Sequence, residues 1–202
     1  MTQGMRGGVG LTTKTGTLML TIAALAMLAL LGGCKDGGNT ENATVDAPPA
    51  DFEAPPEIAE IEPAKAAPEF TVPLVAGGDA SLSDYEGKIL VLDFWATFCV
   101  GCVAELPEYQ ELYANWDSEK VAYLGMSLDG NASTVDAFLK SRPEITLPMA
   151  VAPEAVVDLF LEKNTLPSSR VIDASGMVRY EFRGPGAAKV KEAVRRLLEE
   201  QE

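Results

Sequence analysis

The feature that most constrains this sequence is an apolar run that ends just before two closely spaced cysteines. Residues 88–95 read Lys-Ile-Leu-Val-Leu-Asp-Phe-Trp, and a run of this density is typical of a strand that is buried on both faces. Cys99 and Cys102 follow, and residues 102–117 carry apolar side chains at the three-and-four spacing of a helix. The pattern therefore predicts a strand–turn–helix unit with a C-x-x-C pair at its turn.

Further strands and helices alternate along the chain after Pro68. Strands alternating with helices, followed by a hairpin and a closing helix, predict an α/β sandwich with a central mixed β-sheet flanked by helices. We expect residues 68–202 to form this one domain. The predicted elements are strands at 70–75, 121–127 and 145–151, a loop or turn at 82–87, helices at 132–142, 153–163 and 187–200, and a hairpin of 170–173 and 177–183.

The first 33 residues have the pattern of a bacterial lipoprotein signal peptide. A basic segment precedes an apolar run from Leu18 to Leu31, which at about 14 residues is shorter than the roughly 20 that a membrane-spanning helix needs. The run leads into Gly32-Gly33-Cys34, which resembles a lipobox and implies that Cys34 becomes the lipidated first residue. An ordinary membrane anchor with an incidental cysteine is the alternative. Both predict a chain anchored to a bacterial membrane, inner or outer, on its extracytoplasmic (periplasmic) side.

Residues 34–67 have a different composition from the rest of the chain. They are rich in Gly, Asn, Ala, Pro and Glu and include Pro48-Pro49 and Pro55-Pro56. A segment of this kind buries too little apolar surface to offset the entropy of ordering it. We therefore predict a flexible, acidic and proline-rich tether.

The absence of histidine from the whole chain limits its chemistry. Histidine-based acid–base catalysis and the commonest zinc and copper ligand are excluded, and a net charge of −14 argues against nucleic acid as a partner. A structural zinc site needs about four ligands, whereas only two thiols remain once Cys34 is lipidated. We expect no metal and no cofactor other than a redox-active disulfide between Cys99 and Cys102.

The position of the cysteine pair favours thiol–disulfide exchange. A thiol at a helix N-terminus meets free backbone N–H groups and the positive end of the helix dipole, which stabilise the thiolate. We expect Cys99 to be the attacking nucleophile and Cys102 the resolving thiol. Asp93 stands in the buried run, where an acid is costly without a role, and Glu105 shares a helix face with Cys102. A desolvated Asp93 should titrate at raised pH, near the pH at which exchange needs a base.

From Pro68 to its end the sequence resembles the TlpA/ResA/DsbE-like membrane-anchored thioredoxins. The resemblance implies a thioredoxin-like three-layer sandwich, a cis-proline at Pro167 facing the disulfide, and pairing of Leu166 with the substrate chain. It also implies that Asp93 shuttles a proton to the resolving thiol and that Glu105 tunes the cysteine pKa values and partner selection. The matching residues are Gly87-Lys88, Phe94-Trp95-Ala96-Thr97, the cysteine pair, Glu105-Leu106-Pro107, Leu166-Pro167, Ile172-Asp173 and Gly176.

The residues around the pair are the expected substrate contacts, and two of them depart from the family pattern. Phe98 stands where tryptophan is usual, and Val100-Gly101 lacks the proline that relatives carry at the second place. The missing proline leaves open the reduction potential and therefore the choice between reductant and oxidant. The predicted substrate-binding residues are Trp95, Phe98, Val100, Gly101 and Leu166.

These observations together predict an enzyme that reduces disulfides in exported proteins, with apocytochrome c among the clients that the resemblance implies. The resemblance further implies a membrane electron donor of the DsbD/CcdA type, and we expect a monomer. Two alternatives remain open. One is a copper-delivery module, although copper carriers on this fold use a C-x-x-x-C pair plus a distant histidine. The other is a peroxidase on the related peroxiredoxin fold, although Ala96 occupies the position of its usual threonine.

Overall fold

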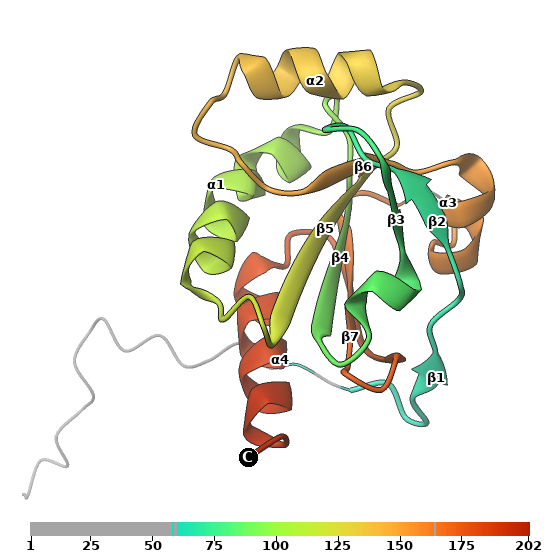
Figure 1. The fold of residues 1–202 in the computed structure, drawn as a ribbon, viewed down its shortest axis with the longest axis vertical. Coiled ribbons are helices and arrows are strands. Elements are labelled where there is room, and N and C mark those ends of the chain that lie inside the picture. The colour runs from blue at the N-terminus through green and yellow to red at the C-terminus, as the bar shows by residue number, and fades with distance from the viewer. Residues whose placement is uncertain (1–57, 59, 164) are drawn as a thin grey trace, which may run out of the picture. The chain divides into compact units, whose positions relative to one another are not determined.

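A six-stranded mixed sheet forms the centre of the protein in a computed structural model, which describes residues 58, 60–163 and 165–202 (Figure 1). The strand order is β1-β8-β7-β4-β5-β6, with β4 parallel to β5 and antiparallel to β7. A separate two-stranded ladder joins β2 (Thr71–Pro73) to β3 (Asp79–Ser81). The strands of the central sheet are β1 (Lys65–Ala66), β4 (Ile89–Trp95), β5 (Val121–Ser127), β6 (Met149–Val151), β7 (Ser168–Ile172) and β8 (Met177–Arg183).

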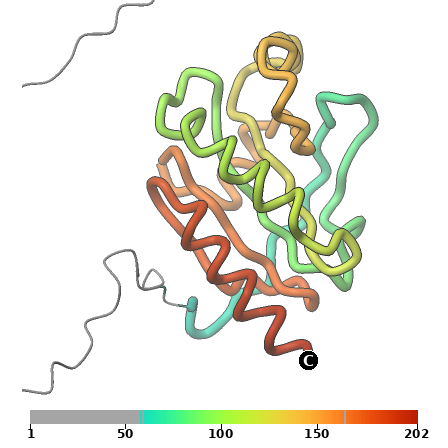
Figure 2. Tube along the Cα trace, turned by 90° about the vertical axis from the view of Figure 1, so that its left-hand side faces the viewer, coloured from blue at the N-terminus to red at the C-terminus, as the bar shows by residue number. Residues whose placement is uncertain are grey.

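Helices cover both faces of this sheet. On one face α1 (Val100–Asn115) and α4 (Ala187–Glu199) lie side by side, as Figure 2 shows from that side. On the other face α3 (Glu154–Phe160) packs together with the β2–β3 ladder. The helix α2 (Ala132–Lys140) connects β5 to β6 and packs Val135 against the core on the α1 side. This three-layer α/β arrangement confirms the predicted fold class.

The strand β4 carries the site and lies in the middle of the core. All seven of its residues are buried. Because side chains alternate across a strand, Ile89, Val91 and Trp95 join the cluster under α1 and α4, whereas the intervening Leu92 and Phe94 join the cluster under α3. Burial on both faces is the arrangement that the dense apolar run predicts.

Most predicted elements are present, and the differences have local causes. β5 and β8 have the predicted bounds, and α1 begins two residues earlier than predicted, at Val100. The strand predicted at 145–151 is reduced to β6, because Pro148 has no N–H to donate to a ladder. The helix predicted at 153–163 ends at Phe160, and Lys163 adopts a left-handed backbone with φ of 63°. The short edge strands β1 and β3 were not predicted.

The predicted tether boundary needs correction. Ile58 is buried against the core, and the backbone N–H of Ile61 donates to the Arg179 carbonyl at 2.8 Å. The Arg179 guanidinium also pairs with Glu60. The domain therefore includes this segment from residue 58 on, because Arg179 of β8 holds it through the Ile61 and Glu60 contacts. The predicted signal peptide, Cys34 and the rest of the tether lie outside the described residues. Within the described part, no helix is long and apolar enough to span a membrane.

Candidate active site

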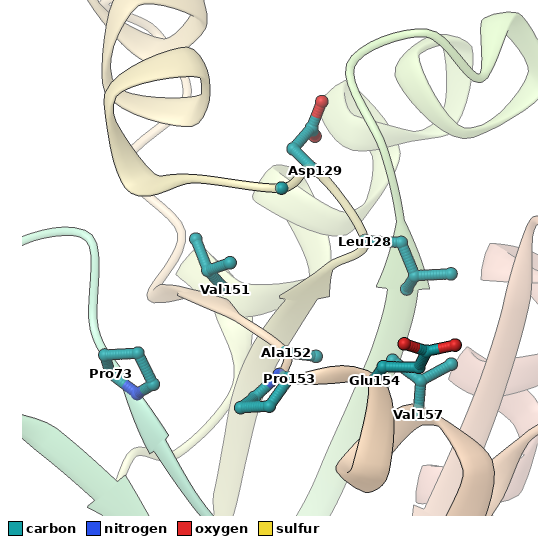
Figure 3. Close-up of a pocket in the computed structure, with 9 residues that line it drawn as sticks. Pro73, Leu128, Asp129, Val151, Ala152, Pro153, Glu154 and Val157 are labelled. Atoms are coloured by element: carbon teal, nitrogen blue, oxygen red, sulfur yellow. The ribbon is translucent and has the colours of Figure 1, made fainter.

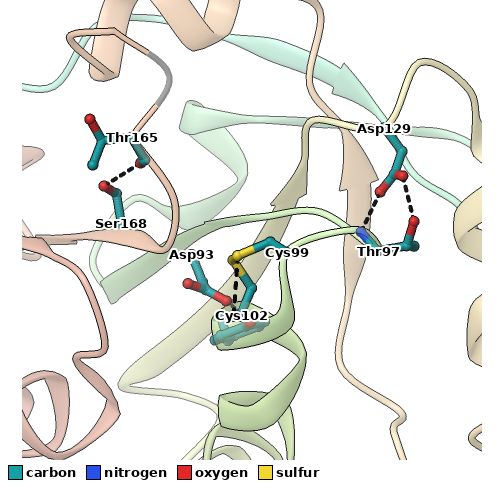
Figure 4. Close-up of a disulfide and its surroundings, with 8 residues drawn as sticks. Asp93, Thr97, Cys99, Cys102, Asp129, Thr165 and Ser168 are labelled. Atoms are coloured by element: carbon teal, nitrogen blue, oxygen red, sulfur yellow. Dashed lines mark hydrogen bonds between the residues drawn. A yellow bond between two sulfur atoms is a disulfide. The ribbon is translucent and has the colours of Figure 1, made fainter.

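The two cysteines stand where β4 gives way to α1, as the sequence predicts. Cys99 is the N-cap of α1, and its sulfur accepts a hydrogen bond from the Cys102 backbone N–H at 3.2 Å. The two sulfurs form a disulfide (Figure 4). A sulfur at this position is stabilised as a thiolate after reduction, because it faces the free N–H groups and positive dipole end of the helix.

The two sulfurs differ in their access to solvent. Cys99 is partly exposed, whereas Cys102 is only 3% exposed and packs in the core. The neighbours of Cys99 are the most exposed large apolar residues of the described chain, with Phe98 72% and Val100 85% exposed. This asymmetry gives an outer sulfur that a protein disulfide can reach and an inner sulfur that only its partner can reach.

A second loop faces the pair from the start of β7. The peptide bond between Leu166 and Pro167 is cis, as the resemblance implies. A Cβ atom built on Gly101 would lie 3.7 Å from the Pro167 Cδ, so this proline adjoins the residues between the cysteines. The Ser168 hydroxyl donates to the Thr165 carbonyl at 2.7 Å and closes the loop (Figure 4). Leu166 is half-buried beside the pair.

Asp93 lies beneath the disulfide on β4. Its side chain points toward Cys102 in Figure 4, and it is 3% exposed. The Tyr123 hydroxyl donates to its Oδ2 at 2.9 Å. Burial raises the pKa of Asp93 to about 7, and the hydrogen bond from Tyr123 opposes this rise while the charge of Glu105 adds to it. A carboxyl group with this pKa exchanges protons near neutral pH.

Two tyrosines and a serine complete a buried polar cluster that the sequence analysis missed. The rings of Tyr109 and Tyr123 lie 5.4 Å apart, and burial raises the pKa of both phenols well above the ordinary value. Ser169 stands opposite Asp93 in the β4–β7 ladder. Both tyrosines occur at apolar positions of a helix and a strand, where the pattern indicates core packing. Nothing in the sequence indicates that they face Asp93.

Glu105 binds the N-terminus of α4. Its Oε1 accepts hydrogen bonds from the backbone N–H groups of Gly186 at 2.6 Å and Ala187 at 3.0 Å. The carboxylate is half-buried between α1 and α4. The predicted placement on the face of Cys102 is correct, but no sequence pattern indicated its partner 81 residues away.

The prediction that Trp95 contacts substrate is wrong. The side chain is 0% exposed, and its ring packs against Phe138 at 5.4 Å between centroids. A Cβ on Gly125 would lie 2.2 Å from the Met149 Sδ and 3.2 Å from the indole Nε1, so this glycine leaves room for both side chains. Among the described residues the indole N–H has no hydrogen-bond partner. Trp95 supports the turn from below because strand parity directs it into the core, beside Asp93.

Asp129 anchors the turn that precedes Cys99, and the sequence analysis missed this residue. Its carboxylate accepts hydrogen bonds from the Thr97 N–H at 2.9 Å, the Thr97 hydroxyl at 2.6 Å and the Ser127 hydroxyl at 2.7 Å (Figure 4). The available signal was its position just after a buried strand parallel to β4, since the carboxyl ends of parallel strands meet at one edge of a sheet.

Asp129 also borders a groove of about 430 Å³ at this end of the sheet (Figure 3). The groove is lined mostly by apolar side chains, with two carboxylates at its rim. Its residues are Pro73, Leu128, Asp129, Gly130, Val151, Ala152, Pro153, Glu154 and Val157. In the part of the chain that the structure describes, no three His, Cys, Asp or Glu residues lie together in a way that could hold a metal ion.

Comparison with known proteins matches this site to a family. The model of the AhpC/TSA family matches residues 63–181, more than half of the chain. The thiol-disulfide oxidoreductase ResA of Geobacillus kaustophilus is 31% identical over 133 residues, which cover 66% of this chain and 74% of the relative. The chain belongs to the ResA-like thiol–disulfide oxidoreductases.

Two further matches agree with this assignment. The ResA of Oceanobacillus iheyensis is 32% identical over 59% of this chain, and the match spans 64% of that relative, slightly less than two thirds of its length. A crystal structure of a thioredoxin-family thiol:disulfide interchange protein from Chlorobium tepidum is 27% identical, with a TM-score of 0.60. That match covers 67% of this chain and 97% of the other.

The ResA-like chain gathers most of its predicted site residues at one end of the sheet. Trp95 ends β4 at the same end of the sheet, but its side chain is fully buried and cannot contact substrate. The residues that the structure brings together around or beneath the disulfide are Asp93, Phe98, Cys99, Val100, Gly101, Cys102, Glu105, Leu166 and Pro167.

Proposed function

We propose that this protein reduces disulfide bonds in exported proteins through the Cys99–Cys102 dithiol. The observation that carries the proposal is the asymmetry of the pair. Cys99 is reachable and sits at the N-terminus of α1, whereas Cys102 is buried one turn later with its backbone N–H on the Cys99 sulfur. A structural disulfide needs neither the exposed partner nor the helix N-terminus, while exchange chemistry needs both.

The first step is attack on the client. The Cys99 thiolate attacks one sulfur of the client disulfide, a new S–S bond forms between enzyme and client, and the other client sulfur leaves as a thiolate that takes up a proton. The exposed Phe98 and Val100 lie beside the attacked bond and offer an apolar surface to the client chain. Leu166 borders the pair from the loop that precedes β7.

The second step resolves the mixed disulfide. Cys102 loses its proton and attacks the Cys99 sulfur, which releases the second client thiolate and leaves the enzyme oxidised by two electrons. Asp93 is the base for this proton, because its carboxyl group lies under Cys102 and its pKa of about 7 makes the charged form available at neutral pH. Tyr123 holds one oxygen of this carboxyl group.

The cellular setting of this chemistry follows from the sequence. The signal-peptide pattern and the Gly32-Gly33-Cys34 lipobox support a lipoprotein that is anchored on the extracytoplasmic side of a bacterial membrane. A membrane protein of the DsbD/CcdA type would supply the two electrons that return the pair to its reduced form. Apocytochrome c is a client that this setting favours: its disulfide would be reduced to two thiols, and cytochrome maturation is the corresponding process.

Insulin reduction tests the proposed activity. The wild-type chain and a Cys99→Ser variant are incubated with insulin and a limiting thiol reductant, and the precipitation of the freed B chain is recorded. We expect acceleration by the wild type and none by the variant, while Cys102→Ser traps a mixed disulfide. No acceleration by the wild type would refute the proposal. Consumption of hydrogen peroxide in place of insulin would favour the peroxidase, for which the buried Ala96 offers no hydroxyl.

A further inference from the structure

One short loop contacts both segments that form the site. The first segment is the N-terminal part of α1, which carries the cysteine pair, and the second is the proline loop at Leu166–Pro167, which faces the pair. The backbone N–H of Gly184 donates to the Pro167 carbonyl at 2.8 Å. Two residues later, the N–H of Gly186 donates to Glu105 on α1 at 2.6 Å. The loop 184–186 therefore connects α1 to the proline loop.

Glu105 supplies the hydrogen-bond acceptor that the start of α4 lacks. The first N–H groups of any helix have no partner within the helix, and the N-cap residue here is Gly186, which has no side chain to accept them. One Glu105 oxygen accepts from both Gly186 and Ala187. The cap of α4 is thus provided by α1, three residues after Cys102.

The bridging loop packs closely against the sheet. Gly184 turns the chain at a φ of 77°, a conformation that other residues rarely adopt. A Cβ on Gly186 would lie 3.4 Å from the Phe182 Cβ and 3.5 Å from the Ser169 Oγ, so the backbone packs directly on β7 and β8. A displacement of α1 is therefore transmitted to the proline loop rather than absorbed between them.

We propose that Glu105 is a positioning residue that fixes the spacing between the cysteine pair and the Pro167 loop through residues 184–186. The inference rests on the proposed reductase function, because this spacing sets where a client chain that contacts the Pro167 loop places its disulfide relative to the attacking Cys99 sulfur. The role requires an acceptor oxygen at the end of a side chain of glutamate length. It does not require the negative charge, which is what the pKa-tuning role implied by the family resemblance requires.

Two conservative variants separate the effect of side-chain length at position 105 from the effect of its negative charge. Glu105→Gln keeps an acceptor oxygen at the same distance and removes the charge, whereas Glu105→Asp keeps the charge and withdraws the oxygen by one methylene. Glu108→Gln, at an exposed position one turn along the same helix, is the matched control. The purified full chain in detergent is assayed for insulin reduction, with kcat and KM determined separately.

We expect Glu105→Asp to lower kcat about ten- to a hundredfold, because misplacement by about 1 Å costs a factor of that order. Glu105→Gln should lose less than about threefold. The amide protons of Gly186 and Ala187 should exchange faster with solvent in Glu105→Asp than in Glu105→Gln. The reverse ranking of the two variants, or equal losses in both, would overturn the proposal.

The failure of this proposal is distinct from failure of the proposed function. A wild-type chain that does not reduce insulin refutes the reductase function. The amide exchange of Gly186 and Ala187 then still tests whether Glu105 holds the N-terminus of α4. Unchanged exchange in Glu105→Asp would show that the oxygen does not hold the α4 terminus, and the positioning role would be rejected.

Discussion

Replacement of Asp93 by asparagine should change the pH dependence of stability. Burial raises the pKa of Asp93 from its ordinary 3.8 to about 7 in the folded protein. Between these two pH values the folded state binds the proton more tightly than the unfolded state. The stabilisation from this group is therefore complete below pH 3.8 and is lost as the pH rises to about 7. Asparagine cannot ionise, so the variant should lack this loss.

The size of this stability change follows from the pKa shift of Asp93. A difference of about three pH units, at about 1.4 kcal/mol per unit, amounts to roughly 4 kcal/mol between pH 4 and pH 8. Asparagine keeps an acceptor for the Tyr123 hydroxyl but adds a buried N–H₂ group, which costs about 1–3 kcal/mol at every pH if it finds no partner. The variant should therefore be less stable than the wild type at pH 4 and more stable at pH 8.

Denaturant unfolding of both proteins in the oxidised form at pH 4, 5.5, 7 and 8 provides the measurement. The quantity of interest is the difference in unfolding free energy between variant and wild type, since titrations shared by both proteins cancel in it. This difference should rise by about 4 kcal/mol across the range, most of it below pH 7. A difference that stays constant within about 1 kcal/mol would refute the assignment of a raised pKa to Asp93.

Three further substitutions test other parts of the site. Tyr123→Phe removes the hydrogen bond that stabilises charged Asp93 and should raise the carboxyl pKa by about one to two units, as read by carbon-13 NMR; Tyr113→Phe is the control, and equal values in both would contradict the reasoning. Asp129→Ala leaves buried donors unpaired and should cost about 2–4 kcal/mol in denaturant unfolding, with a loss below 0.5 kcal/mol counting against it. Phe98→Ala should raise KM for insulin several-fold and leave stability within about 0.5 kcal/mol, because this ring is exposed; an unchanged KM would exclude a client contact.

The elements that could be predicted from the sequence are those whose residues themselves carry the pattern. The apolar runs of β4 and β5 are long, so their bounds were predictable to within a residue. The short strand β1 pairs with the distant β8, and β3 pairs with the nearby β2 across a turn. Neither was predictable, because two or three residues carry no periodicity of their own. The position of the cysteine pair was likewise predictable, because a strand end, a turn and a helix start are consecutive in the chain.

The partners of the site residues were not predictable from pattern, because each comes from a distant part of the chain. Tyr123 reaches Asp93 from the neighbouring strand, and the Glu105 carboxylate meets Gly186 across 81 positions. One error was avoidable. Asp93 and Trp95 are two residues apart on one strand and so share a face, and a buried role for the first implies a buried ring for the second.

The reduction potential of the Cys99–Cys102 pair tests the central claim most directly. The purified chain is equilibrated against dithiothreitol or glutathione buffers, and the fraction of free thiol is determined at each ratio. We predict a reversible two-electron couple near that of thioredoxin, about −270 mV, as a reductant of exported proteins requires. A value near that of DsbA, about −120 mV, would make the protein a disulfide donor, and the absence of a reversible couple would contradict the redox function altogether.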